Sequence, residues 1–166
     1  MERALKLRIA RIEPAQNEAA RRVIFAVAFE FFGQGEEFEA WKTRAGQTWL
    51  SSEINELATH FAQNGGAFWV LLDGEEVVGT GGVLLVDERT CELKRMYIVP
   101  RARGLGWGRK LSQTAIEWAR GAGFKSMRLD TDEVLVAATA LYRSLGFVPI
   151  PRYKESGADL FFELKL

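Results

Sequence analysis

Hydrophobic and polar residues alternate near the start of the chain, and continuous apolar runs occur in its middle; both patterns predict β-strands. Residues 5–9 alternate apolar and polar side chains, and this first strand is expected to end before Pro14. Residues 67–87 read AFWVLLDGEEVVGTGGVLLVD, which is two apolar runs joined by an Asp-Gly pair. That arrangement is typical of a β-hairpin. A third antiparallel strand is expected over residues 91–99, where a proline follows.

Longer apolar patterns predict the helices. Residues 17–32 form an apolar helical segment that begins with an asparagine suited to cap it and ends before two nearby glycines. A second helical region, residues 37–63, is less regular, and Gly46 is expected to break it. Two further helices are expected over residues 108–122 and 136–145.

The remaining apolar segments complete an alternating order of elements. Strands are expected at residues 126–132, 147–151 and 160–166, the last of which could offer an exposed edge to a second subunit. The order β-α-α-β-β-β-α-β-α-β-β indicates an α+β domain with a mixed sheet. In this order, the helix after residue 107 connects two parallel strands.

The segment VPRARGLGWGRKL, residues 99–111, contains three glycines at alternate positions among basic residues. The dinucleotide-binding pattern G-x-G-x-x-G fails in both registers, because Arg109 or Leu111 stands where the third glycine is required. The phosphate loop of nucleotide hydrolases is excluded as well, since no Gly-Lys-Ser or Gly-Lys-Thr occurs in the chain.

What remains is the pattern R-x-x-G-x-G, filled by Arg103, Gly106 and Gly108. Glycines let backbone N–H groups turn toward an anion, and the helix that follows adds its unpaired N–H groups and the positive end of its dipole. Six cations and no acid lie between residues 93 and 110, which suits a pyrophosphate. The alternative is a glycine-rich surface turn with solvated charges. The cations are Lys94, Arg95, Arg101, Arg103, Arg109 and Lys110.

Composition narrows the class of protein. A chain of 166 residues with 48% hydrophobic content suits one domain, and the formal net charge of +0 gives no reason to expect nucleic acid or an acidic membrane surface as a partner. One cysteine, Cys91, and one histidine, His60, exclude an internal disulfide and a zinc site of the usual kind, so no metal is expected. The charged N-terminus lacks a signal-peptide core, which favours the cytoplasm, and residues 23–32 are too short to span a bilayer.

Three segments together resemble the GNAT superfamily of N-acetyltransferases: CELKRMYIVPRARGLGWGRKL from residue 91, MRLDTD from residue 127 and ALYRSLGF from residue 140. The resemblance is strong over residues 77–147 and extends by element order over nearly the whole chain. It implies a single domain over residues 1–166. The implied fold is a central mixed, mostly antiparallel sheet, splayed at the cofactor site and flanked by helices on both faces.

The resemblance also implies a binding site for acetyl-coenzyme A. The loop and the start of the next helix would contact its pyrophosphate, and the backbone of the preceding strand would contact the pantetheine and the thioester. Trp107 could pack on the cofactor or lie at the solvent edge. At residue 135, where many members carry an asparagine that meets the pantetheine, this chain has Leu135, so Thr131 or Asp132 would have to replace that contact. The implied contacts are Met96, Tyr97, Ile98, Arg103, Gly104, Leu105, Gly106, Trp107, Gly108 and Arg109.

Amide formation from a thioester needs a base for the amine, a donor for the oxyanion and support for the leaving thiolate. Glu92 is the candidate base, and its alternative role is to pair with a cation or orient the substrate. A strand N–H near Met96 is the candidate oxyanion donor. Tyr142 is the candidate acid beside the departing sulfur, and its alternative role is to fill the core.

Two functions remain open at this point. The first is an N-acetyltransferase that passes an acetyl group from acetyl-coenzyme A to a primary amine of a small molecule or peptide by direct attack. The second is a non-catalytic module that binds coenzyme A or its acyl forms as a sensor or structural ligand. Neither hypothesis involves nucleic acid or a membrane, and a homodimer fits both.

Overall fold

The computed structural model describes residues 4–48 and 52–166. Within them the strands form one seven-stranded sheet in the order β1-β2-β3-β4-β5-β7-β6. Neighbouring strands are antiparallel except β4 and β5, which run parallel. The strands are β1 (Leu7–Arg11), β2 (Ala67–Asp73), β3 (Glu76–Leu85), β4 (Thr90–Ile98), β5 (Ser126–Thr131), β6 (Val148–Pro149) and β7 (Leu160–Lys165).

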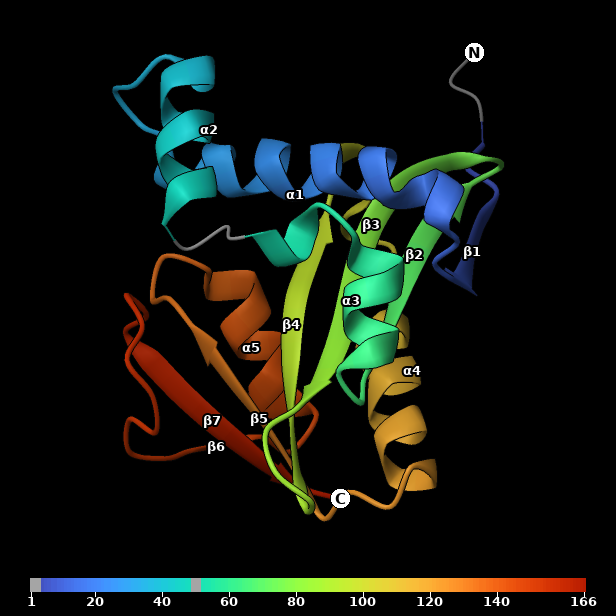
Figure 1. Ribbon diagram of the computed structural model, residues 1–166, viewed down its shortest axis with the longest axis vertical. Coiled ribbons are helices and arrows are strands. Elements are labelled where there is room, and N and C mark those ends of the chain that lie inside the picture. Colours follow the sequence, from blue (N-terminus) through green and yellow to red (C-terminus); the bar gives the residue numbers. More distant parts are fainter. Residues whose placement is uncertain (1–3, 49–51) are drawn as a thin grey trace.

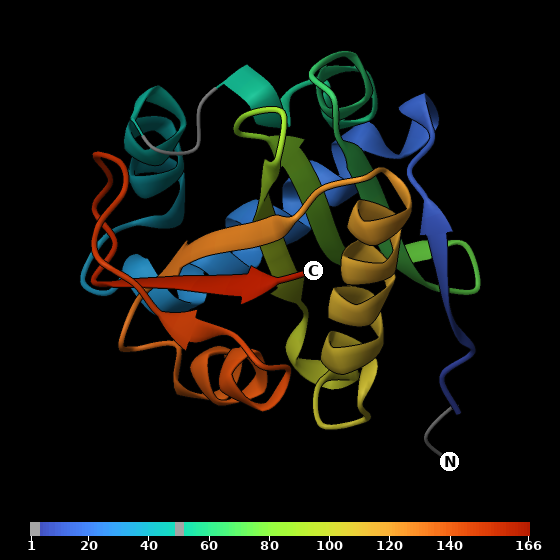
Figure 2. The same cartoon turned by 90° about the horizontal axis from the view of Figure 1, so that it is seen from below.

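Helices cover both faces of this sheet. Figure 2 shows α2 and α3 on one side of the sheet and α4 and α5 on the other. The buried side chains of α1 pack with those of α2 and α3, whereas α4 and α5 contribute to a second core cluster with β5 and β7. The helices are α1 (Asn17–Phe32), α2 (Phe38–Gln47), α3 (Leu57–Gln63), α4 (Trp107–Gly121) and α5 (Val136–Ser144), with short 3₁₀ turns at Pro14–Gln16, Ser52–Ile54 and Pro100–Ala102.

The two parallel strands at the centre of the sheet separate soon after they meet. They pair only where residues 90–92 of β4 face residues 126–128 of β5. Beyond that point they diverge, as Figure 1 shows. β5 pairs instead with β7 along its whole length. The result is a gap between β4 and β5, and Tyr142 of α5 lies beside it.

Most of the elements predicted from the sequence are confirmed, with three corrections. Asn17 does not cap α1 but is its first residue, and its side chain instead accepts a hydrogen bond from the Ala58 N–H at the start of α3. The helical region of residues 37–63 ends its first helix at Gln47 rather than at Gly46, and residues 49–51 lie outside the described residues. The strand of residues 160–166 is not an edge strand, because β7 lies between β5 and β6.

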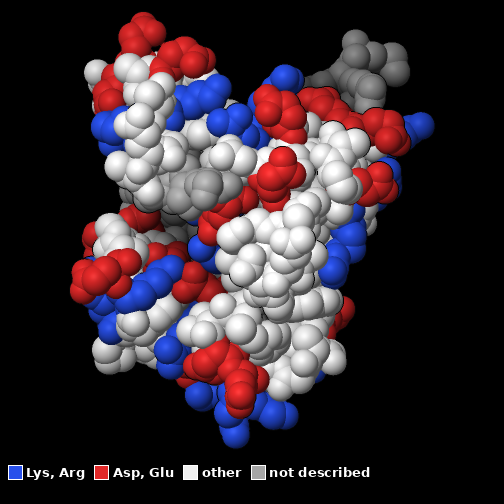
Figure 3. Space-filling model, in the orientation of Figure 1, with Lys and Arg blue, Asp and Glu red and all other residues white. Residues whose placement is uncertain are grey.

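The surface charge, the helix lengths and the grouping of possible metal ligands each bear on the function. Acidic and basic side chains are interleaved over the face drawn in Figure 3. Among residues 4–48 and 52–166, no helix has the length and apolar content needed to cross a membrane. In the same residues, histidine, cysteine and acidic side chains form no group of three or more that could hold a metal ion.

Candidate active site

The loop between β4 and α4 has the backbone geometry of an anion site. Gly104 and Gly106 adopt φ angles of 74° and 80°, in the left-handed region that favours glycine. A Cβ added at either position would meet no atom within 4 Å, so the space above the loop is open. Gly106 is the N-cap of α4, and the first helical hydrogen bond runs from the Lys110 N–H to the Gly106 carbonyl.

The backbone N–H groups of residues 104–109 donate to no carbonyl or side chain in the part of the chain that the structure describes. Unpaired N–H groups at the start of a helix are usual, but here the run also includes the loop before the helix. Together with the positive end of the helix dipole, these N–H groups are suited to hold an anion. The structure thus shows the unpaired N–H groups that the glycines of this loop led us to expect, and the binding of a pyrophosphate there stays a prediction.

Arg103 does not point its guanidinium into this open space. Its Nη1 and Nη2 donate to the two carboxylate oxygens of Glu30 on α1, at 2.7 and 2.8 Å, and its Nε donates to the Ile98 carbonyl at 2.8 Å. The hydrogen bond from Arg103 lowers the pKa of Glu30. The side chain therefore joins α1, the end of β4 and the loop, which sequence reasoning did not foresee.

The other cations grouped by the sequence are separated in the structure. Arg101 pairs with Asp73 and Glu76. Trp107 packs with an apolar cluster near β1 and β3, and the Lys110 ammonium lies 4.1 Å from the centre of its ring. Arg109 donates to the Ser144 hydroxyl at 2.6 Å, and with Lys110 it is the remaining cation at the start of α4.

A β-bulge interrupts β4 beside the gap. The register between β3 and β4 shifts between Thr80 and Gly82, and Arg95 has a φ of 57°, the one positive φ of a non-glycine residue among the described residues. Such a conformation costs about 1 kcal/mol and needs support from its surroundings. The buried Thr80 hydroxyl provides it by donating to the Arg95 carbonyl at 2.7 Å.

The bulge exposes the strand backbone to the gap. The Val99 N–H donates to the Val78 carbonyl on β3, and N–H directions alternate along a strand. The N–H groups of Met96 and Ile98 therefore point away from β3, toward the gap, where β5 no longer pairs with β4. Tyr97 is opposite Thr80 on β3, and its ring packs against the core cluster of α1.

Glu92 lies at the last position where β4 still pairs with β5, and only 5% of the residue is exposed. Both of its carboxylate oxygens are engaged. The Tyr153 hydroxyl donates to Oε2 at 2.7 Å, and the Lys154 ammonium donates to Oε1 at 2.8 Å. Both partners belong to the segment between β6 and β7, which sequence reasoning did not connect with Glu92.

The protonation of these partners follows from their surroundings. Burial and the Glu92 carboxylate raise the pKa of Tyr153, so its phenol keeps its proton and donates. Burial alone would lower the pKa of Lys154, but its hydrogen bond to Glu92 and the charges of Glu92 and Asp130 outweigh that effect and raise it. Lys154 is therefore an ammonium, and it also lies 3.3 Å from Asp130 on β5.

The charges continue along the same face of β4. Glu53, which is 9% exposed, lies 2.6 Å from an Arg95 nitrogen and 3.2 Å from the Lys94 ammonium. Burial raises the pKa of Glu53, but Arg95 and Lys94 outweigh this effect and hold it below its ordinary value. The charged side chains thus form an alternating series of acids and bases, Asp130, Lys154, Glu92, Lys94, Glu53 and Arg95.

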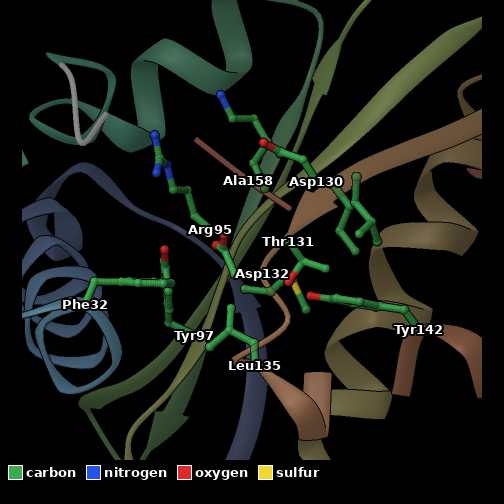
Figure 4. Close-up of a pocket in the computed structure, with 13 residues that line it drawn as sticks. Phe32, Arg95, Tyr97, Asp130, Thr131, Asp132, Leu135, Tyr142 and Ala158 are labelled. Carbon is green, nitrogen blue, oxygen red and sulfur yellow. The ribbon is translucent and has the colours of Figure 1, made fainter. Parts of the chain in front are cut away.

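The gap contains a pocket of about 150 Å³ between β4 and β5. Figure 4 shows Tyr142 of α5 with its hydroxyl pointing into this pocket. That hydroxyl makes no hydrogen bond within residues 4–48 and 52–166. Burial raises the pKa of Tyr142, so the phenol keeps its proton and can donate a hydrogen bond to a ligand. The pocket is also lined by Leu135, which stands where the sequence lacks an asparagine. The polar residues Thr131 and Asp132 line the same pocket, so they lie near that position.

Cys91 is not part of this chemistry. It is fully buried, and burial raises the pKa of its thiol to about 12. Its Sγ donates to the Ser126 carbonyl at 3.6 Å. The residue therefore packs β4 against β5 as a neutral thiol.

Sequence reasoning missed Tyr153, Lys154, Glu53 and Glu30. Each of them meets its partner across a large separation in sequence, from 41 residues for Glu53 to 73 for Glu30. No local pattern marks such contacts. The one available signal was the Tyr-Lys pair between two strands expected at the C-terminal end of the sheet.

Known proteins were compared with this chain in sequence and in structure. The family model described as the acetyltransferase (GNAT) family matches residues 31–147. The uncharacterized N-acetyltransferase YjgM of Escherichia coli is 36% identical over 140 residues, which cover 82% of this chain and 79% of that protein. Human N-acetyltransferase 8B is 32% identical over 118 residues, 68% of this chain and 49% of that protein, so the match spans about half of that relative.

The fold comparison points the same way. The crystal structure of the PaiA N-acetyltransferase from Thermoplasma acidophilum, solved in complex with coenzyme A, matches this structure with a TM-score of 0.80 and 15% sequence identity. The match covers 98% of this chain and 100% of that one. The splayed sheet, the glycine loop and the family model agree, and the chain belongs to the GNAT acetyltransferase family.

Proposed function

We propose that this protein transfers an acetyl group from acetyl-coenzyme A to a primary amine of a small molecule or peptide by direct attack. Membership of the GNAT family supports acyl transfer from acetyl-coenzyme A. The observation that carries the proposal is the run of free N–H groups at residues 104–109, in the loop that follows β4, one of the two strands that border the gap. The coenzyme A bound to the Thermoplasma protein of the same fold supports this choice of donor.

The residues of the gap suit each part of such a donor. The free N–H groups of the loop would hold the pyrophosphate, with Arg109 and Lys110 nearby. The N–H groups of Met96 and Ile98 face the space where the pantetheine and the thioester would lie. A fixed N–H of this kind can stabilise the oxyanion without reorganisation, and Met96 is our choice for that role.

In the reaction a C–N bond forms and the C–S bond of the thioester breaks. Glu92 takes a proton from the attacking amine, directly or through water, once one of its present partners gives way. Tyr142 supports the thiolate. Full proton transfer from an ordinary phenol to a thiolate is already uphill by about 2 kcal/mol, and the raised pKa of Tyr142 makes it harder. Tyr142 therefore donates a hydrogen bond to the sulfur and keeps its proton.

Both carboxylate oxygens of Glu92 already accept hydrogen bonds, and this observation favours a second function, a module that binds coenzyme A without catalysis. Thiol release from acetyl-coenzyme A across small amines, amino acids, aminoglycosides and short peptides separates the two. The transferase predicts release with one class of amine, reduced at least tenfold in Glu92→Gln and Tyr142→Phe. Binding of coenzyme A with no release across the panel would favour the binding module.

A further inference from the structure

The ammonium of Lys154 lies between two carboxylates that belong to different strands. Its Nζ is 2.8 Å from Glu92 Oε1 and 3.3 Å from Asp130 Oδ1. The Tyr153 hydroxyl holds the other oxygen of Glu92. We call the place of this nitrogen, between Glu92 and Asp130, the ammonium site.

The ammonium site adjoins the pocket in which acyl transfer would occur. Asp130 of β5 lines that pocket together with Arg95 of β4, and Figure 4 shows both residues around it. Glu92, the candidate base, forms the other half of the site. A base must lie within hydrogen-bond reach of the amine it deprotonates, and the nitrogen now within that reach is the ammonium of a lysine.

The carboxylates and the lysine differ in how firmly they are placed. Glu92 and Asp130 are strand residues whose side chains are 7% and 21% exposed. Lys154 belongs to the segment between β6 and β7, and its side chain is 31% exposed. Moving the lysine out would leave both carboxylates in place, with less water than at the surface and no cation between them.

We propose that the acceptor is an unbranched alkyl primary ammonium that displaces Lys154 and binds Glu92 and Asp130 in its place. This inference rests on the proposed function, because it names the substrate class of the same site. The exchange replaces one ammonium with another, so the charge around the carboxylates is unchanged. An aryl amine, which is neutral at pH 7, would not replace the positive charge of Lys154 beside the two carboxylates.

The test is calorimetric binding of n-butylamine, which has the four-carbon stem and the ammonium of a lysine side chain, to the full chain loaded with coenzyme A. Lys154→Met removes the competing ammonium, and n-butylamine is expected to bind it about tenfold more tightly than the parent. Lys154→Gln, which keeps a donor for Glu92, serves as a second variant in case methionine disturbs the fold. Aniline should show no gain.

Two controls make the result specific to the ammonium site. Asp130→Asn added to Lys154→Met should reverse the gain, because it removes one of the two carboxylates. Lys125→Met removes an exposed lysine outside the site and should leave binding as in the parent. Equal affinity in the parent and both Lys154 variants, or a gain that survives Asp130→Asn, would overturn the proposal.

The readout needs no turnover, so the two proposals can fail separately. Tighter n-butylamine binding in Lys154→Met without thiol release from any amine would keep the ammonium site and refute the transferase. Thiol release by the parent with no gain in binding would do the reverse. In an active parent, Lys154→Met should also lower the KM for the amine, whereas a purely positioning role would lower kcat and leave that KM unchanged.

Discussion

On the donor side of the gap, the backbone N–H groups of residues 104–109 bond nothing in the described residues. On the acceptor side, Glu92, Lys94 and Arg95 of β4 are each engaged by an opposite charge. The main chain of a loop before a helix can stay unpaired because it faces solvent, whereas partly buried charges cannot. Under the proposed function, the donor side can therefore bind its ligand as it stands, whereas the acceptor side must exchange partners to bind one.

Part of this contrast was predictable from the sequence. The glycine pattern around Gly104 and Gly106 identified the donor loop, because positive φ angles and free N–H groups are local properties. Two apolar runs joined by an Asp-Gly pair likewise predicted the hairpin of β2 and β3, and a long apolar segment predicted the helix α1. These features depend on neighbours close in the chain.

The acceptor side was not predictable in the same way. Glu92 was identified, but its engagement by Tyr153 and Lys154 depends on a chain path that returns 61 and 62 residues later. The bulge of β4 occurs at Arg95, a residue type that does not indicate a positive φ, and it depends on a hydrogen bond from Thr80 of the neighbouring strand. Arg103 was assigned to the pyrophosphate, and its contact with Glu30 required knowing where α1 lies.

The largest expected effect comes from breaking the acceptor side at Glu53. Glu53→Gln should lower the free energy of unfolding in urea by about 3 kcal/mol, because it leaves Lys94 and Arg95 without their buried carboxylate. Glu75→Gln is the control. Glu75 is 94% exposed and pairs with Arg8, so its loss should cost under about 0.5 kcal/mol.

The loss of unfolding free energy in Glu53→Gln should depend on pH, and the direction of that dependence is fixed. The pKa of Glu53 is lowered in the folded protein, so its contribution is complete above its ordinary value of 4.5 and is lost as the pH falls. The difference in unfolding free energy between the parent and Glu53→Gln should therefore shrink as the pH falls below 4.5. A difference that stays constant into acid would contradict the charge pairing.

The donor side is broken most directly at Gly106. Gly106→Asp should weaken acetyl-coenzyme A binding about a hundredfold in calorimetry, since it strains a left-handed residue and places a carboxylate beside the pyrophosphate. Gly123→Asp is a matched control, because Gly123 also has a positive φ with open space around it, at the other end of α4. Equal loss of binding in both variants would show that strain alone was responsible.

A smaller effect is expected at Tyr142, which faces the pocket between the two sides. Its hydroxyl bonds nothing in the described part of the chain, so Tyr142→Phe should leave the melting temperature unchanged. The kcat should fall about tenfold while the KM for acetyl-coenzyme A changes little, because the lost hydrogen bond acts on the departing sulfur. A lower melting temperature with unchanged kcat would assign the residue to core packing alone.

The smallest effect is expected at Glu30, which ties the donor loop to α1 through Arg103. Glu30→Gln should cost about 0.5 kcal/mol of unfolding free energy, because both side chains are at least one-third exposed. Acetyl-coenzyme A should still bind within about threefold of the parent, since the loop N–H groups are untouched. A large loss of binding would mean that the side chain of Arg103 carries the donor site.

The central claim is that the backbone N–H groups of the donor loop hold acetyl-coenzyme A. Amide hydrogen exchange of the parent protein, measured with and without the donor, tests it residue by residue. Amide exchange at residues 104–109 should slow strongly when acetyl-coenzyme A binds. Amide exchange at Met96 and Ile98 of β4 should slow as well. Binding of acetyl-coenzyme A with unchanged exchange in residues 104–109 would contradict the account.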